Sequence, residues 1–164
     1  MIEISLSAPN SAVATVIRET SSYGGRLLET GGFLFSPVDS NTLTGVALAG
    51  NTGIIRHRQL FQISERALDR LFTFADDRGF WIPVQFHSHE KAAFMSKTDA
   101  RDGLRVEGFT STVIPEFAAP TNDVRSWGWW QFRGGDWHRC TPVTTYAGEI
   151  DLVVVFDEDG VHEP

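Results

Sequence analysis

The chain has a single cysteine, Cys140, among its 164 residues. One thiol cannot build an internal disulfide framework or a cysteine-based zinc site. No apolar run is long enough to span a membrane, and the N-terminus, MIEISLSAPN, has neither the positive region nor the apolar stretch of a signal peptide. These features favour a cytoplasmic protein.

Basic residues are also few, with 14 Lys and Arg against 21 Asp and Glu, so the formal net charge is −7. Nucleic-acid binding needs a basic surface, and no basic cluster offsets the acidic balance. The composition therefore argues against a nucleic-acid partner. The length and the 41% hydrophobic residues are sufficient for one globular domain with a sizeable core.

The hydrophobic pattern predicts a mixture of helices and strands. Helices are expected at 11–22 with Ser11 as N-cap, at 64–77 with Ser64 as N-cap, and at 99–106. Strands are expected at 31–35, 43–49, 81–86, 109–114, 127–132, 137–140 and 152–156. The first two would pair antiparallel, and 127–140 would form a hairpin. A mobile acidic tail is expected from residue 157.

These elements do not alternate strictly as β-α-β units. The sequence therefore predicts a single domain, residues 1–164, with an α/β or α+β sheet flanked by helices. Its core would span about residues 8–156, and we find no repeat or linker that divides the chain.

Two histidines follow directly on the apolar stretch 81–86, in the run HSHEKAAFMSKTD. Side chains at i and i+2 of a strand share one face, so His87 and His89 can converge on one point. A helix beginning near Asp99 could bring a carboxylate back to that point. Two imidazoles and one carboxylate suit Zn²⁺ with an open position for water, and they favour zinc over iron or cobalt.

Two further residues have the chemistry to complete a hydrolytic site. Glu29, in LLETGGFLF, can act as the general base that takes a proton from water and delivers it to a leaving amine. Ser96 can donate a hydrogen bond to the developing oxyanion. Simpler roles stay open: Ser96 or Asp99 could only cap the following helix, and Glu29 could be a surface carboxylate at a strand end.

The order of these residues resembles the JAMM motif of the MPN/JAB (Mov34/PAD-1) metalloprotease family. The matching pieces are Glu29 in ETGG, His87-Ser88-His89, and Ser96-Lys97-Thr98-Asp99, and the resemblance covers roughly residues 8–156. It implies a curved mixed sheet flanked by helices, with cytidine-deaminase-like layering. It further implies one zinc ion per chain, bound by His87, His89 and Asp99, with Glu29 as base and Ser96 as oxyanion donor.

The resemblance also implies a substrate. Family members cleave isopeptide or peptide bonds after ubiquitin or ubiquitin-like proteins, and bacterial members also process sulfur-carrier proteins. The expected partner is therefore a ubiquitin-like modifier or its conjugate, with activating and conjugating enzymes of the same bacterial conjugation or antiphage defence pathway. Neither nucleic acid nor membrane is expected as a partner. The alternatives are a peptidase that processes a sulfur-carrier protein and a non-catalytic MPN scaffold, although scaffold members have generally lost ligands that this chain retains.

Two departures from the family pattern concern the loop after the second histidine. The family usually has Pro there, whereas this chain has Glu90, and the segment from Glu90 to Met95 is one residue shorter than is common. These changes alter the rim of the cleft. Glu90 is interpreted as a solvated loop residue that could tune access to the metal.

Other candidate residues are interpreted as structural. His57 is expected in a surface loop and His138 on a hairpin surface, while Cys140 is expected to be a buried small hydrophobe. The tryptophans of the 127–137 region could form a binding platform, but core or hairpin packing is favoured because Trp is a large apolar filler. They are Trp127, Trp129, Trp130 and Trp137.

Overall fold

A computed structural model describes all of residues 1–164. Three α-helices form: α1 (Asn10–Gly24), α2 (Glu65–Arg78) and α3 (Lys97–Asp102), with a short 3₁₀ helix η1 (Val124–Ser126). The strands are β1 (Ser7–Pro9), β2 (Gly31–Pro37), β3 (Gly45–Ala49), β4 (Ile54–His57), β5 (Leu60–Ile63), β6 (Phe80–Ser88), β7 (Thr110–Ile114), β8 (Gly128–Arg133), β9 (Asp136–Arg139), β10 (Thr144–Tyr146), β11 (Leu152–Asp157) and β12 (Gly160–His162).

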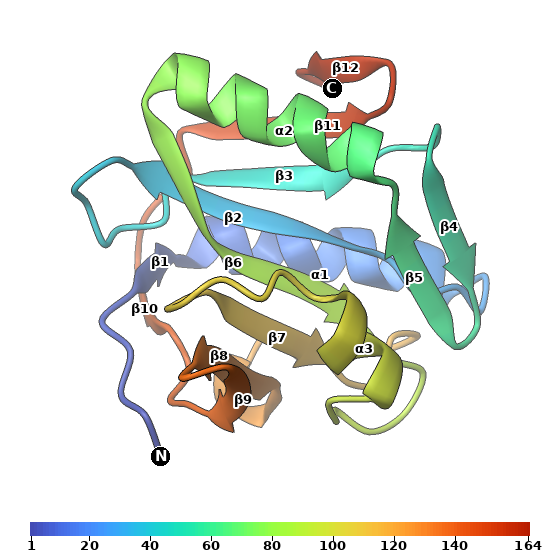
Figure 1. Cartoon of the computed structure of the whole chain (residues 1–164). Helices are drawn as coiled ribbons and strands as arrows, with labels where there is room; N and C mark the ends of the chain where they lie inside the picture. Colours follow the sequence, from blue (N-terminus) through green and yellow to red (C-terminus); the bar gives the residue numbers. More distant parts are fainter.

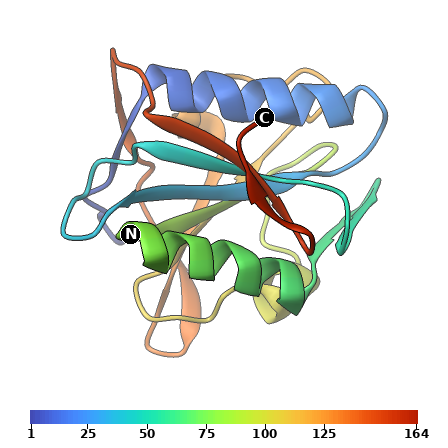
Figure 2. The same ribbon diagram turned by 90° about the horizontal axis from the view of Figure 1, so that it is seen from above.

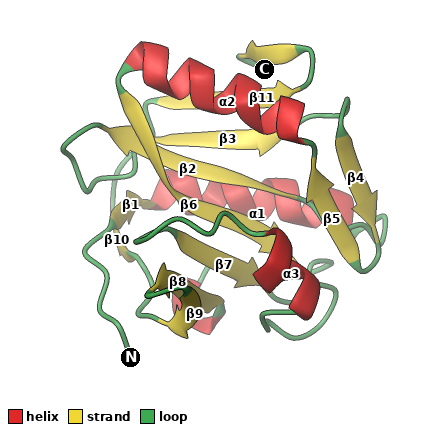
Figure 3. Ribbon diagram, in the orientation of Figure 1, coloured by secondary structure: helices red, strands yellow, loops and turns green.

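The main sheet has eight strands in the order β12-β11-β3-β2-β6-β7-β8-β9 (Figure 1). The β11–β3 and β6–β7 pairs are parallel and the other pairs are antiparallel. The hairpin β4–β5 forms a separate two-stranded sheet, as does the pair β1–β10 (Figure 3). The prediction of a single-domain mixed sheet flanked by helices is confirmed.

Helices α1 and α2 cover opposite faces of the main sheet (Figure 2). Successive side chains of β2 point to opposite faces of the sheet, as in any pleated strand. Phe33 and Phe35 belong to the core cluster that contains Leu71 of α2, whereas Leu34 belongs to the cluster that contains Val16 of α1. The sheet is therefore buried on both sides, with β2 and β6 near its centre.

Gly31 lets three elements meet beside the end of β6. It pairs with His87 in the β2–β6 ladder. A Cβ added at Gly31 would lie 2.4 Å from the Phe86 carbonyl oxygen, 2.6 Å from the Phe61 ring and 3.1 Å from the His87 Cβ. Only glycine permits this approach of β2, β6 and the β4–β5 hairpin.

One of the two predicted helix N-caps is confirmed, at α2, and the other is wrong, at α1. Ser64 caps α2 as predicted, because its Oγ accepts the Ala67 N–H at 3.1 Å. The prediction that Ser11 caps the first helix is wrong: Pro9 is the N-cap of α1, and the Ser11 Oγ accepts the Ile150 N–H at 2.6 Å. A distant backbone donor competes for that hydroxyl, and the sequence gives no sign of it.

One further helix prediction needs correction. Helix α3 does not reach residue 106, because Gly103 is already extended at φ −65° and ψ 160°. Helix α2 buries Leu71 and Ala75 against the sheet, whereas Phe72 is 37% exposed. Phe72 lies at the edge of the core, where its ring centroid is 6.1 Å from that of Phe33.

All seven predicted strands form, but the sequence did not reveal β1, β10, β12 or the β4–β5 hairpin. The expectation of a mobile acidic tail from residue 157 is wrong over residues 157–162. Asp157 is buried and its carboxylate accepts the N–H groups of Asn51 and Asp159, so it closes the β11–β12 hairpin against the loop after β3. No helix combines the length and apolarity needed to cross a membrane.

Candidate metal centre

The two histidines lie at the end of β6, in the middle of the sheet. His87 belongs to the strand and His89 follows its last residue, Ser88. The neighbours β2 and β7 pair with His87 on both sides, through Gly31 and Val113. Both imidazoles are buried, each with 6% of the residue exposed, so two ring nitrogens are held at one point away from bulk water.

Asp99 reaches the same point from α3. A reciprocal capping box begins this helix: the Ser96 Oγ accepts the Asp99 N–H at 3.0 Å, and the Ser96 N–H donates to Asp99 Oδ2 at 3.1 Å. The capping box fixes the Asp99 carboxylate on the side of α3 that faces β6. The Asp99 carboxylate therefore takes part in the cap of α3 and is also a candidate metal ligand.

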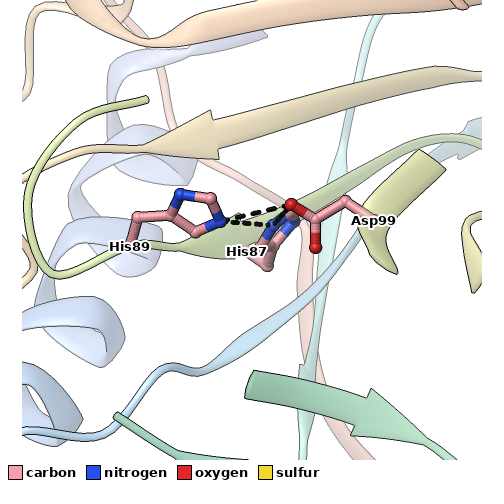
Figure 4. A group of neighbouring side chains, drawn as sticks. All are labelled: His87, His89 and Asp99. Atoms are coloured by element: carbon pink, nitrogen blue, oxygen red, sulfur yellow. Dashed lines mark hydrogen bonds and ion pairs between the residues drawn. The ribbon is translucent and has the colours of Figure 1, made fainter. Parts of the chain in front are cut away.

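The three ligand atoms form a compact triangle (Figure 4). The Nε2 atoms of His87 and His89 are 3.2 Å apart, and Asp99 Oδ2 lies 3.2 Å and 3.3 Å from them. A tetrahedral zinc ion with bonds of about 2.0–2.1 Å holds its ligand atoms about 3.3 Å apart. The residues present therefore fit a metal ion of this kind, with the fourth position left to solvent or substrate.

The surroundings of His89 prepare its Nε2 for a metal. The Nδ1 lies 3.1 Å from the Ala92 carbonyl oxygen, so in the neutral ring Nδ1 carries the proton and Nε2 presents a lone pair. Burial lowers the pKa of His89, but the hydrogen bond to Asp99 and the charges of Glu29 and Asp99 together raise it by more. The net shift of this pKa is therefore upward. Burial raises the pKa of the Asp99 carboxyl, yet hydrogen bonds from the two histidines outweigh burial and the net shift is downward.

Glu29 lies in the same pocket as His89, Ser96 and Asp99. It is 5% exposed, so the interpretation as a surface carboxylate is wrong. Burial raises the pKa of its carboxyl to about 7, the charge of His89 lowers it, and that of Asp99 raises it. A carboxylate with a pKa near neutrality can both accept and return a proton, which is the property of a general base.

The Ser96 hydroxyl lines this pocket while it caps α3. Its oxygen accepts the Asp99 N–H, and its own proton remains available for donation. Capping therefore does not exclude the predicted role toward an oxyanion. The five predicted site residues are thus brought together, and their roles stay predictions.

Two cavities meet at Asp99 and Thr98. One, of about 350 Å³, contains Glu29, His89 and Ser96, and the other, of about 720 Å³, contains His87 together with one side of the β4–β5 hairpin. Phe94, which is 54% exposed, stands at the smaller cavity with its ring centroid 4.8 Å from that of His89. The candidate metal site therefore opens on both sides along one face of the hairpin.

Sequence reasoning missed the β4–β5 hairpin and its contacts with the site. Glu90 lies in a surface loop as interpreted, but its carboxylate accepts two hydrogen bonds from Arg58 of the hairpin, at 2.6 Å and 2.7 Å. Arg58 lies between β4 and β5, and both side chains line the smaller cavity. The sequence signal for this hairpin is weak, because Ile54–His57 is short and has two apolar residues followed by two polar ones instead of an alternation.

The residues interpreted as structural lie away from the metal triangle. His57 is exposed on β4 rather than in a loop, and His138 is exposed on β9. Cys140 is buried, and burial raises the pKa of its thiol to about 11, so it is not an activated nucleophile. The tryptophans pack as predicted, with three of them buried and the fourth half-buried: Trp127, Trp129, Trp130 and Trp137.

No protein-family model matches the sequence, and no curated protein matches it. Solved structures do match the fold. A crystal structure of a JAB1/MPN domain protein from Archaeoglobus fulgidus has a TM-score of 0.52 at 13% identity, over 87% of this chain and 98% of that one. A solution structure from Desulfitobacterium hafniense has a TM-score of 0.67 at 13% identity, over 88% of this chain and 94% of that one.

A second solution structure, of a protein from Salinibacter ruber, has a TM-score of 0.56 at 22% identity, over 90% of this chain and 95% of that chain. Together these likenesses show that the chain has a JAB1/MPN-like fold. At such identities they concern the fold alone, so the chemistry of the site has to be argued from its own residues.

Proposed function

We propose that this protein is a zinc-dependent isopeptidase or peptidase of the JAMM type, which hydrolyses the bond after the C-terminus of a ubiquitin-like modifier. The observation that carries the proposal is the triangle of His87, His89 and Asp99 beside the buried carboxylate of Glu29. A metal-ligand set alone would also serve a structural site. A buried base in the adjoining cavity is what a hydrolase needs in addition.

Each site residue has a proposed role in the reaction. His87, His89 and Asp99 would hold the ion, which when bound supplies Lewis acidity and lowers the pKa of water from about 15.7 toward about 7. Glu29 accepts the proton of the attacking water and returns it to the leaving amine. The Ser96 hydroxyl donates a hydrogen bond to the oxygen of the carbonyl under attack.

The β4–β5 hairpin offers a path for the substrate. Its two strands pair only with each other, and Phe61, Gln62 and Ile63 of β5 line the larger cavity beside His87. A modifier tail is extended and can pair with such a free strand edge through main-chain hydrogen bonds. The tail would then lead its last carbonyl toward the metal triangle.

The proposal includes partners and a setting. The substrate is a ubiquitin-like modifier or its conjugate, and activating and conjugating enzymes of the same bacterial pathway would supply it. We propose no nucleic-acid or membrane partner, in keeping with the net charge of −7. The setting is the cytoplasm, in which the one thiol stays reduced.

The test combines metal content with cleavage. The purified chain, wild type and Glu29→Gln, is loaded with zinc, and its metal content is measured by plasma mass spectrometry. Both proteins are then incubated with purified ubiquitin-like modifiers that are fused at their C-termini to a lysine-linked peptide or to a single cysteine. The expected result is about one equivalent of zinc in both proteins and cleavage by the wild type alone, because the substitution removes the base and leaves the ligands.

Each other outcome has a defined meaning. Cleavage of only the cysteine adduct would assign the enzyme to sulfur-carrier processing. Full cleavage by Glu29→Gln would refute the assigned mechanism. Tight, metal-independent binding of a modifier without turnover would replace the proposal with a non-catalytic scaffold.

A further inference from the structure

Glu29 lies outside any helix or strand. Helix α1 ends at Gly24, and Leu27 has a positive φ of 59°, so the chain turns sharply before β2 begins at Gly31. No regular ladder holds the candidate base. Its place depends on bonds from other parts of the molecule.

Backbone bonds from two directions hold this segment. The Glu29 N–H donates to the His57 carbonyl oxygen of β4 at 2.9 Å. The Thr30 N–H donates to the Ser88 Oγ at 3.0 Å, and the Ser88 N–H donates to the Thr30 carbonyl at 2.9 Å. One anchor is therefore the end of β6, and the other is the β4–β5 hairpin.

Arg56, which precedes His57, binds that hairpin to the rest of the fold. Its Nε donates to Thr30 Oγ1 at 3.1 Å, and its two terminal nitrogens donate to the carbonyl oxygens of Ala49 and Gly50, each at 2.6 Å. The planar guanidinium thus joins β4, the end of β3 and the residue next to Glu29.

The other contacts of Arg56 hold its guanidinium in a fixed orientation. Its guanidinium carbon lies 4.1 Å from the centre of the Tyr23 ring on α1, and the charge of Glu19 on the same helix acts on it. The side chain is half-buried. Buried arginines require partners for their donors, and here three N–H bonds and one aromatic face provide them.

We infer that Arg56 is a positioning residue for Glu29, which it holds against the metal triangle through Thr30 and through the His57 carbonyl. The inference rests on the proposed function for its catalytic consequence. Arg56 contacts none of His87, His89 and Asp99, which β6 and α3 hold through their own bonds. Loss of Arg56 therefore displaces the base and spares the metal ligands.

The first test is amide hydrogen exchange, which needs no substrate. Zinc-loaded wild type and Arg56→Lys are compared by NMR. Lysine is chosen because it keeps the positive charge but cannot form the three hydrogen bonds of the planar guanidinium. The Glu29 and Thr30 amides are expected to exchange at least about tenfold faster in Arg56→Lys. The β6 amides should be unchanged, except that of Ser88, which donates to the Thr30 carbonyl. The matched control is Arg26→Lys, because exposed Arg26 lies over the same Tyr23 ring at 5.6 Å and forms none of these bonds.

The second test is kinetic, on a modifier fusion that the wild type cleaves. Arg56→Lys is expected to reduce kcat on the order of 10²-fold, as misplacement of a reacting group by about 1 Å can do, with KM and zinc content unchanged. Thr30→Val removes only the Arg56–Thr30 bond and should give a smaller loss of kcat in a protein that folds normally. Together these variants separate displacement of the base from general loss of stability.

The outcomes distinguish this inference from the proposed function. If the wild type cleaves and Glu29→Gln does not, unchanged kcat in Arg56→Lys and Thr30→Val overturns the positioning role alone. If the wild type cleaves nothing, the proposed function fails, and amide exchange still decides whether Arg56 holds Glu29. Unchanged protection at Glu29 and Thr30, or equal acceleration throughout β6, overturns the inference in either case.

Discussion

The candidate site consists of two halves that are built differently. The metal half, His87, His89 and Asp99, lies within residues 87–99 on the end of β6 and the first turn of α3. The base half, Glu29 and Thr30, lies on an irregular segment. Contacts with Arg56 and Ser88, which are 26 and 58 residues from Thr30, hold it in place.

The comparison indicates which half tolerates change. Strand pairing and a capping box fix the metal half locally, so a distant substitution should leave metal binding intact. The base half depends on Arg56 and the β4–β5 hairpin as well as on its bonds to Ser88, so loss of Arg56 can displace it while the metal stays bound. The predictions below test this separation, beginning with the largest effect.

The largest effect is expected from His89→Ala, which breaks the metal half itself. Only two ligands would remain, and loss of even an outer partner of a metal ligand costs about 10–100-fold in affinity. Zinc affinity should therefore fall by at least about 10²-fold, and cleavage should fall to background. Isothermal titration of the metal-free chain with zinc measures the change. His138→Ala, at an exposed histidine on β9, is the control, and undiminished zinc binding by His89→Ala would contradict the assignment.

Ser96→Ala tests a residue that serves the metal half as a cap and the reaction as a donor. Loss of the cap should cost about 1 kcal/mol of stability, and loss of the oxyanion donor should lower kcat on the order of 10²–10³-fold. Ser96→Thr keeps both groups and should retain most of each. Chemical denaturation and steady-state kinetics on the same samples separate the two roles. A stability loss with unchanged kcat would leave capping as the only role.

The pH dependence of stability tests the base half without metal. Burial raises the pKa of Glu29 from 4.5 to about 7 in the folded chain, so the folded state binds more protons than the unfolded state in that window. The free energy of unfolding should therefore fall as pH rises from about 5 to about 7, and the raised pKa of His89 acts in the same direction. The lowered pKa of Asp99 acts oppositely, since its stabilisation is lost as pH falls below its usual value of 3.8.

Urea denaturation of the metal-free chain at several pH values measures this slope. Glu29→Gln should flatten it, whereas Glu65→Gln, at an exposed glutamate of α2, should not. An unchanged slope in Glu29→Gln would show that Glu29 is not buried in its neutral form.

The smallest effect is expected at the exposed pair between Arg58 and Glu90. Both hydrogen bonds lie at the surface, where an ion pair adds little to stability because water and salt screen the charges. Glu90→Gln should change the midpoint of thermal denaturation only slightly and leave zinc content unchanged. Thermal denaturation at low and high salt measures it. A much larger loss would mean that this pair, rather than Arg56, anchors the hairpin.

Much of the fold could be predicted from the sequence. All seven expected strands form, and Ser64 caps α2, because these features depend on neighbours in the chain. The errors arose where a distant group competes. The Ser11 hydroxyl oxygen accepts the Ile150 N–H instead of capping α1. The Asp157 carboxylate accepts the Asn51 N–H instead of extending into solvent.

The metal half follows from residues that are close together in the chain. A two-residue period brings His87 and His89 to one face, and a capping box orients Asp99, so local geometry sufficed to predict a compact ligand set. The position of the candidate base depends instead on the tertiary fold. Glu29 reaches the site because Arg56 and the β4–β5 hairpin fold back onto its segment, and no local pattern encodes contacts between residues so far apart in the chain.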